Sequence, residues 1–158
     1  MSTSEALLSL GSNLGDRRAL IDAAVARLAT LPKTIVRARS SYYRTEPVGP
    51  VQQEWFLNIA VAVRTGQART GLAAACRVIE AELGRDRSKE ISWGPRPIDI
   101  DVVAFGNEET NDLRAFVLVP LAEIAPLALV AGRSVGELAA EADPAGVEKL
   151  DWPVPAVV

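Results

Sequence analysis

The sequence contains no histidine, one cysteine and few aromatic residues, and each scarcity narrows what the protein can be. Without histidine the chain lacks the commonest general base and the commonest transition-metal ligand, so a bound metal is expected to be a hard cation with oxygen ligands. The single Cys76 excludes an internal disulfide. It lies in an alanine-rich helical pattern, which is typical of a small core residue.

Long apolar runs and nucleotide-binding glycine motifs are also absent. No stretch of about 18 apolar residues occurs, so no membrane-spanning segment is expected. The N-terminal sequence MSTSEALLSLGSN has neither a basic start nor a long apolar run, which argues against a secretory signal and favours a cytoplasmic protein. The motifs G-x-x-x-x-G-K-S/T and G-x-G-x-x-G do not occur. The weaker glycine loop at 11–15 is most simply a strand-to-helix turn.

The overall composition fits one globular domain that spans residues 1–158. Hydrophobic residues make up 49% of the chain and charged residues 23%, which is ordinary for a soluble fold with a sizeable core. The net charge of −3 gives no reason to expect a nucleic-acid partner. Small molecules are therefore the expected ligands.

Hydrophobic periodicity predicts an alternation of strands and helices. Strands are expected at residues 6–10, 34–43, 55–64, 97–105 and 116–119. Helices are expected after the capping residue Asp16 through Leu28, at 70–83 with Gly84 as its C-terminal stop, and after the capping residue Ser134 through Ala140. The proline-interrupted tail DWPVPAVV should pack as extended chain. Strands paired by hairpins and two separate blocks of helix predict an α+β sandwich with a mainly antiparallel sheet.

Two aspartates interrupt the apolar strand expected at 97–105. Since side chains alternate along a strand, Asp99 and Asp101 should share one face, while Ile98, Ile100 and Val102 face apolar packing. Neighbouring carboxylates repel each other, and one tends to take up a proton unless a cation lies between them. Mg²⁺ favours one or two carboxylates together with substrate phosphates and water, so the pair is a candidate magnesium site.

Arginines and aromatic residues cluster around this pair in the sequence. The guanidinium groups of Arg85, Arg87 and Arg96 match phosphate geometry. A dication facing arginines suits phosphoryl transfer, in which the protein mostly positions groups and neutralises charge. The alternative is a solvated strand face with surface ion pairs.

A flat ligand is suggested by a second group of residues. Trp93, Phe56 and Phe116 lie in or beside expected loops, and Asn58 offers both donors and acceptors to the edge of a ring. Packing in the core is the alternative for Phe56 and Phe116, and composition alone favours it.

Five segments carry a family resemblance, in the same order along the chain. They are LSLGSNLGDR (8–17), SSYYRTEPVGPVQQEWFLN (40–58), GRDR (84–87), WGPRPIDIDVVAFGN (93–107) and RAFVLVPLAEIAP (114–126). Together they cover most of the chain, which resembles the 6-hydroxymethyl-7,8-dihydropterin pyrophosphokinase family. The resemblance implies transfer of pyrophosphate from ATP to the pterin alcohol in folate biosynthesis, with AMP as the other product. It also implies a three-layer αβα sandwich with a ferredoxin-like core.

The resemblance further implies roles for individual residues. Asp99 and Asp101 are similar to the ligands of two Mg²⁺ ions, and Arg85, Arg87 and Arg96 to catalytic arginines that bind phosphate. The pterin pocket implied by the family pattern consists of Thr45, Val48, Phe56, Asn58, Trp93 and Phe116. The implied ATP-binding residues are Glu80, Arg87, Arg96, Ile100 and Arg114. Arg87 and Trp93 would lie in a mobile loop that closes over the substrates, and a monomer is expected.

The chain departs from the family pattern after the aspartate strand. The family usually has a Pro-His-Pro stretch there, whose histidine helps to hold the nucleotide. Here only EETNDL (108–113) stands between Asn107 and Arg114, so about a dozen residues are missing. The stretch is naturally short, was deleted, or is disordered and left out of the sequence as written; we favour the last. If it is short, Asn111, Asp112 and Leu113 must bridge the strands in another way.

Two other interpretations of the function stay open at this point. The chain could be a non-catalytic pterin- or nucleotide-binding protein on the same fold. It could also be a different Mg²⁺-dependent nucleotide transferase that shares only the paired aspartates. Release of AMP from ATP in the presence of the pterin alcohol would separate the first alternative from the enzyme, and failure to bind any pterin would favour the second.

Overall fold

A computed structural model describes residues 2–108, 112, 114–130 and 132–157 of the chain. Its first half contains β1 (Ser4–Ser12), α1 (Arg17–Leu28), β2 (Thr34–Arg39), β3 (Tyr43–Thr45), β4 (Phe56–Thr65) and α2 (Arg69–Glu82). The second half contains a short 3₁₀ helix η1 (Arg87–Lys89), β5 (Asp99–Phe105), α3 (Ala115–Ile124), β6 (Leu129–Val130), β7 (Arg133–Ser134), α4 (Val135–Glu141) and β8 (Val147–Lys149).

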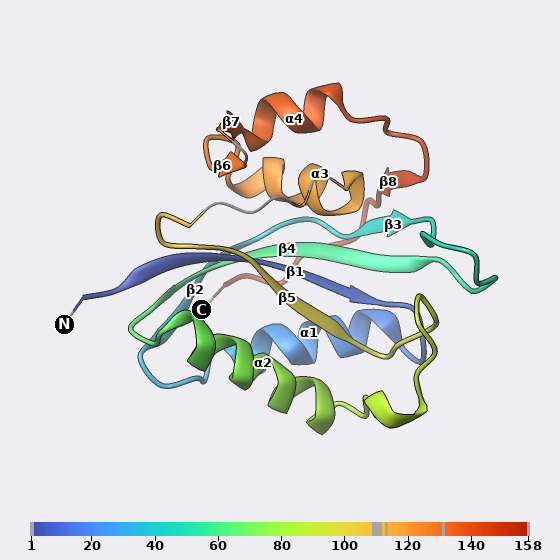
Figure 1. Ribbon diagram of the computed structural model, residues 1–158, viewed down its shortest axis with the longest axis horizontal. Helices are drawn as coiled ribbons and strands as arrows, with labels where there is room; N and C mark the ends of the chain where they lie inside the picture. Colours follow the sequence, from blue (N-terminus) through green and yellow to red (C-terminus); the bar gives the residue numbers. More distant parts are fainter. Residues whose placement is uncertain (1, 109–111, 113, 131, 158) are drawn as a thin grey trace.

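One antiparallel sheet forms the middle layer of the molecule. Its strands run in the order β5-β1-β4-β3-β8, and β2 also pairs with β4. Figure 1 shows α1 and α2 against one face of this sheet and α3 and α4 against the other. The predicted α+β class, the antiparallel sheet and the three layers are thus confirmed.

The two helix caps predicted from the sequence are present. The Asp16 side chain accepts a hydrogen bond from the backbone N–H of Ala19, and the Ser134 side chain accepts one from the N–H of Glu137. After α2, Gly84 has φ +102°, a left-handed conformation that side chains with a Cβ rarely adopt. The chain can therefore reverse there and enter the loop that leads to β5.

The core has two parts, one on each side of the sheet. The larger part lies between the sheet and the first two helices and includes Cys76, which is fully buried as predicted. The smaller part lies under α3 and α4. The start of the predicted extended tail packs on the larger part: the N–H of Leu150, just before the tail, donates to the carbonyl oxygen of Tyr42, and the Trp152 ring lies 5.5 Å from the Tyr42 ring. Within the described residues, every helix is too short or too polar to cross a lipid bilayer.

Two predicted strands differ from the structure. The strand expected at 116–119 is wrong, because these residues belong to α3. The inward-facing residues of α3 include Val117, Leu118 and Leu121, a helical spacing that four residues before a proline do not reveal. Pro120 lies inside the helix, where it has no N–H to donate to the carbonyl of the preceding turn.

The strand expected at 34–43 is confirmed only through Arg39, because β2 ends there and a separate strand, β3, begins at Tyr43. Between them, the hydroxyl of Ser40 accepts the hydrogen bond of the Ala60 N–H, while the Ser40 N–H donates to the Ala60 carbonyl. A side chain thus replaces one backbone acceptor, and the regular ladder is interrupted.

Candidate active site

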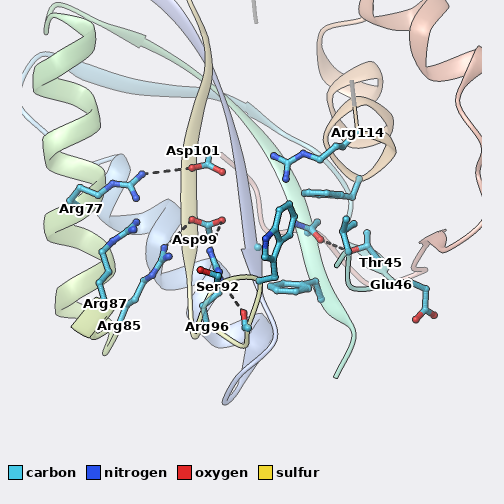
Figure 2. A pocket seen from close by; sticks show the side chains of 17 residues that line it. Thr45, Glu46, Arg77, Arg85, Arg87, Ser92, Arg96, Asp99, Asp101 and Arg114 are labelled. Carbon is cyan, nitrogen blue, oxygen red and sulfur yellow. Dashed lines mark hydrogen bonds and ion pairs between the residues drawn. The ribbon is translucent and has the colours of Figure 1, made fainter. Parts of the chain in front are cut away.

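A cavity of about 460 Å³ opens beside β1, β4 and β5, next to the loops that precede β4 and β5 and the start of α3. Figure 2 shows the side chains that line it. The predicted site residues that line this cavity are Thr45, Val48, Phe56, Asn58, Arg85, Arg87, Trp93, Arg96, Asp99, Asp101, Arg114 and Phe116. The structure therefore brings together predicted residues that are spread over positions 45–116 of the chain.

The carboxylate pair lies on the edge strand β5, and each carboxylate faces a guanidinium group. Asp99 Oδ1 accepts a hydrogen bond from Arg85 Nη1 at 2.9 Å, and Asp99 Oδ2 lies 3.7 Å from Arg96 Nη1. Asp101 Oδ1 lies 3.8 Å from Arg77 Nη2. Burial, and then the charge of Asp99, raise the pKa of the Asp101 carboxyl above its ordinary value. The two carboxylates share one face of β5 and one cavity, as the alternation of the sequence predicts.

Glu80 lies behind the cavity wall and organises the arginines around the pair. This residue is 1% exposed. Its Oε2 accepts hydrogen bonds from Arg85 Nη1 at 3.0 Å and from the Ile100 N–H at 2.7 Å, and its Oε1 accepts one from Arg87 Nη2 at 3.1 Å. A single carboxylate of α2 thus fixes β5 and two arginines relative to each other.

Ile100, predicted to contact ATP, is not brought into the cavity. The residue is fully buried among the apolar side chains between the sheet and α1 and α2. Only its peptide groups take part in the site: the N–H donates to Glu80, and the carbonyl oxygen accepts from Arg77 Nη2 at 2.7 Å. Ile100 can therefore contact ATP only through its backbone.

Arg85 is almost completely enclosed, with a side chain that is 2% exposed. Its Nε and Nη2 donate to the two carboxylate oxygens of Glu90 at 2.6 and 3.0 Å, and its Nη1 donates to Glu80, to Asp99 and to the carbonyl of Ile98. Burial alone would lower the pKa of Arg85, but the hydrogen bonds to Glu90 and Asp99 outweigh it and raise the pKa. The same contact with Arg85 lowers the pKa of Glu90. Arg85 therefore connects the loop before β5 to α2 and to β5.

The other end of the cavity is aromatic, with one amide in its wall. Asn58 is 4% exposed, its Oδ1 accepts from the Thr45 hydroxyl at 2.5 Å, and its Nδ2 donates to the carbonyl of Leu10 at 3.2 Å. The Arg114 guanidinium lies 4.6 Å from the centre of the Phe116 ring. Trp93 is 53% exposed and has φ +65°, so a mostly free indole borders the cavity. These groups form a slot suited to a flat, polar-edged ring.

Asn13 connects the two loops that border the cavity, a role that the sequence analysis missed. Its Nδ2 donates to Gln53 Oε1 and to the carbonyl of Glu54, both at 2.9 Å. Its Oδ1 accepts from the Arg96 N–H at 2.9 Å, and its own N–H donates to the Arg96 carbonyl at 3.2 Å. Gln53 in turn donates to the carbonyl of Trp93. The turn at 11–15 therefore positions both loops.

Other residues at the cavity were missed as well. Arg77 and Glu46 line it, and so do Gly11, Ser92 and Gly94. For Arg77 the sequence held one signal, its place three residues before Glu80 on the same helix, which puts both on one side of α2.

The short connection between β5 and α3 is only partly described. Glu108 forms a bridge with Phe105, and Asp112 accepts hydrogen bonds from Arg114 Nε at 2.9 Å and Nη2 at 2.6 Å. Asn111 and Leu113, which were expected to help bridge the strands, lie outside the described residues. Asp112 thus orients Arg114 beside the aromatic slot.

Comparison with known proteins agrees with this geometry. The family model for 7,8-dihydro-6-hydroxymethylpterin-pyrophosphokinase matches residues 7–126. The chain is 47% identical over 157 aligned positions to a 2-amino-4-hydroxy-6-hydroxymethyldihydropteridine pyrophosphokinase of Methylorubrum extorquens, with 92% of this chain and 98% of that protein covered. It is 40% identical to the enzyme of the same name from Pseudomonas aeruginosa, with 90% and 94% covered. Since 92% of this chain is about 145 residues, about a dozen positions of the first alignment have no counterpart here.

A solved structure matches the fold at low sequence identity. The chain resembles the crystal structure of Plasmodium falciparum HPPK-DHPS with pteroate, with a TM-score of 0.67, 13% identity and 89% of this chain covered. The chain corresponds to 42% of that longer protein. Family model, relatives and fold agree, and the two rival interpretations of the function are set aside. The chain belongs to the 7,8-dihydro-6-hydroxymethylpterin-pyrophosphokinase family and is a pyrophosphokinase of folate biosynthesis, with ATP as its co-substrate.

Proposed function

We propose that this pyrophosphokinase depends on magnesium and that Asp99 and Asp101 hold two Mg²⁺ ions. The observation that carries the proposal is the pair of carboxylates on one face of β5, in the same cavity as the arginines. Among the described residues no cluster of three or more metal-ligating side chains occurs. A two-carboxylate site nevertheless fits Mg²⁺, which keeps several waters and takes its remaining ligands from substrate phosphates. When bound, the metal would supply positive charge to the phosphates.

The arginines then divide into two roles. Arg87, Arg96 and Arg114 have exposed or partly exposed guanidinium groups in the cavity wall, which suits them to bind phosphate oxygens. Arg85 is enclosed by carboxylates, so we assign it the task of holding Asp99 in place. Glu80 contributes to ATP binding through the arginines that it orients.

The pterin would occupy the aromatic slot. Phe56, Phe116 and Trp93 offer ring faces, while Asn58 and Thr45 offer polar groups to the ring edge, and Val48 closes the apolar side. In this arrangement the pterin would lie next to the arginines. Its hydroxymethyl group would thus be directed toward the phosphates of ATP.

The reaction is a displacement at the β-phosphorus of ATP. The hydroxymethyl oxygen forms a bond to that phosphorus, the bond from the phosphorus to the oxygen bridging to the α-phosphate breaks, and AMP leaves with the bridging oxygen. The hydroxyl proton would pass to an oxygen of the transferred pyrophosphoryl group and reach solvent when the site opens; the chain contains no histidine to accept it. The residues act by positioning and by neutralising charge, and closure of the loop that carries Arg87 and Trp93 would exclude water.

We further propose that the chain acts as a single domain and a monomer, because its residues 11–116 supply both the carboxylate pair and the aromatic slot. The requirement for ATP supports a cytoplasmic location, and small molecules rather than nucleic acid are its partners.

The test is the dependence of AMP release on Mg²⁺ and on Asp101. With ATP and the pterin alcohol, Asp101→Asn should lower the rate at least about a hundredfold, because a charge-stabilising group is lost from the site. Binding of the pterin should change little, which would show that the fold is intact. Asp151→Asn, in the exposed tail, is the matched control and should retain the normal rate. A near-normal, Mg²⁺-dependent rate in Asp101→Asn would overturn the assignment.

A further inference from the structure

Arg77 projects from α2 toward the carboxylate pair, and none of the roles described above uses it (Figure 2). Its Nη2 donates to the carbonyl oxygen of Ile100 at 2.7 Å, and its Nη1 lies 3.1 Å from Glu80 Oε1. The same Nη2 lies 3.8 Å from Asp101 Oδ1. The guanidinium group is thus fixed on one side by buried partners and faces the cavity on the other.

The contacts of Arg77 differ from those of Arg85. Arg85 is 2% exposed and donates from all three of its nitrogens to protein oxygens, so a ligand could reach it only by displacing them. Arg77 is 41% exposed, and its distance of 3.8 Å to Asp101 is too long for a hydrogen bond. Arg77 therefore has donor capacity left for a ligand.

We propose that Arg77 is an additional phosphate-binding residue for the nucleotide. A planar guanidinium donates two parallel hydrogen bonds to a phosphate, and one that the protein already holds in place loses less freedom on binding. A group bound at Asp101 is a direct neighbour of Arg77. The inference rests on the proposed function, since it requires the phosphates of ATP to lie at the carboxylate pair.

A purely structural role is the competing explanation. In that case Arg77 only neutralises Glu80 and Asp101, and its loss would leave phosphate binding unchanged or would disturb the whole site. The two explanations therefore differ in the affinity for a nucleotide measured separately from the affinity for the pterin.

The experiment is isothermal titration with α,β-methylene-ATP, in which the bond that the reaction breaks is replaced. Arg77→Gln, at saturating Mg²⁺, should weaken binding of the analogue about ten- to a hundredfold, because a charge-assisted pair of hydrogen bonds is lost. Arg77→Lys keeps the charge without the planar fork and should recover part of the affinity. Binding of 6-hydroxymethylpterin should stay within about twofold of the wild type in both variants.

Arg69→Gln is the matched control on the same helix. Arg69 is 40% exposed and donates to a β5 carbonyl and to Glu108. Its contacts resemble those of Arg77, which donates to β5 and pairs with Glu80, but Arg69 does not line the cavity. Its substitution should leave both affinities unchanged.

Unchanged analogue binding in Arg77→Gln would overturn the inference, and so would equal losses for analogue and pterin. If Arg77→Gln fails to fold, Arg77→Lys decides the matter, since wild-type affinity in that variant would also contradict a role for the fork. The proposed function fails in a different way, namely if the wild-type protein binds the analogue equally well without Mg²⁺.

Discussion

Replacing Arg85 by methionine should destabilise the folded enzyme strongly at neutral pH. Methionine keeps the apolar stem and removes the guanidinium. The buried Glu80, together with Glu90 and Asp99, then loses its closest cation. Removing one partner of a buried ion pair costs about 3–5 kcal/mol, a large part of the roughly 5–15 kcal/mol that holds a protein folded. For a chain of this size the loss corresponds to a fall in Tm of about 6–20 °C.

The loss should depend on pH in a definite direction. Arg85 lowers the pKa of Glu90 in the folded protein. A carboxyl whose folded pKa is depressed contributes stability above its unfolded pKa, which is about 4.3 for glutamate, and this contribution disappears as the pH falls through the folded pKa. The difference in free energy of unfolding between wild type and Arg85→Met should therefore be largest near neutral pH and shrink in acid. Urea unfolding of both proteins at several pH values measures it.

Arg27→Met provides the control for this prediction. Arg27 pairs with Glu82 at 2.9 Å, but both side chains are exposed by 41% and 51%. Such surface pairs contribute at most about 1 kcal/mol. The reasoning is wrong if Arg85→Met costs no more than Arg27→Met at neutral pH, or if its cost is the same at acid pH.

Two further predictions concern the aromatic slot and the tyrosines. In Gly11→Ala the new Cβ would lie 2.6 Å from Asn58 Nδ2, so the pterin affinity measured by fluorescence titration should fall at least about tenfold. Gly71→Ala on α2 is the control and should leave the affinity unchanged, because its Cβ would meet only the Gln67 side chain, at 3.4 Å. Equal affinities of the two variants would refute the tight fit at Gly11. Tyr42 and Tyr43 are the only tyrosines in the chain. Burial raises the pKa of both, and so does a hydrogen bond to Asp22 for Tyr42 and to Glu123 for Tyr43. Tyrosinate absorbance should therefore appear near pH 10 in urea but only at higher pH in the folded protein. The stability that the two tyrosines contribute is present below their unfolded pKa and is lost as the pH rises through their folded pKa. Coincident titrations of folded and unfolded protein would contradict this prediction.

The carboxylate pair and the helix caps could be predicted because they are local. Alternation over five residues places Asp99 and Asp101 on one face, and a cap requires only a side chain and the N–H three residues later. Helix α3 could not be predicted, because its inward-facing spacing becomes visible only over a longer stretch than residues 116–119, whose pattern alone predicts a strand.

Long-range contacts could not be predicted from the pattern. Asn13 is tied to Gln53 and Arg96, which lie 40 and 83 positions away, so nothing near Asn13 indicates its partners. Arg69 and Arg77 look alike on α2, and only the packing of that helix against β5 brings one of them to the cavity. The sequence predicts the chemistry of single residues, whereas their positions relative to one another depend on tertiary structure.

The charges at the cavity support the proposed need for a metal where arginines are already abundant. Each guanidinium of the cluster is within 4 Å of a carboxylate oxygen, so the cluster as a whole carries little net positive charge. Its members are Arg77, Arg85, Arg87, Arg96, Glu80, Glu90, Asp99 and Asp101. Free ATP would still meet the negative charge of Asp101, which Arg77 balances only from 3.8 Å. ATP that arrives with magnesium would supply the cation proposed for the two carboxylates, and Arg77 and Arg96, which lie beside them, would then become available to the phosphates. On the proposed function the carboxylate pair would select the magnesium complex of the nucleotide, and the arginines would act only after that selection.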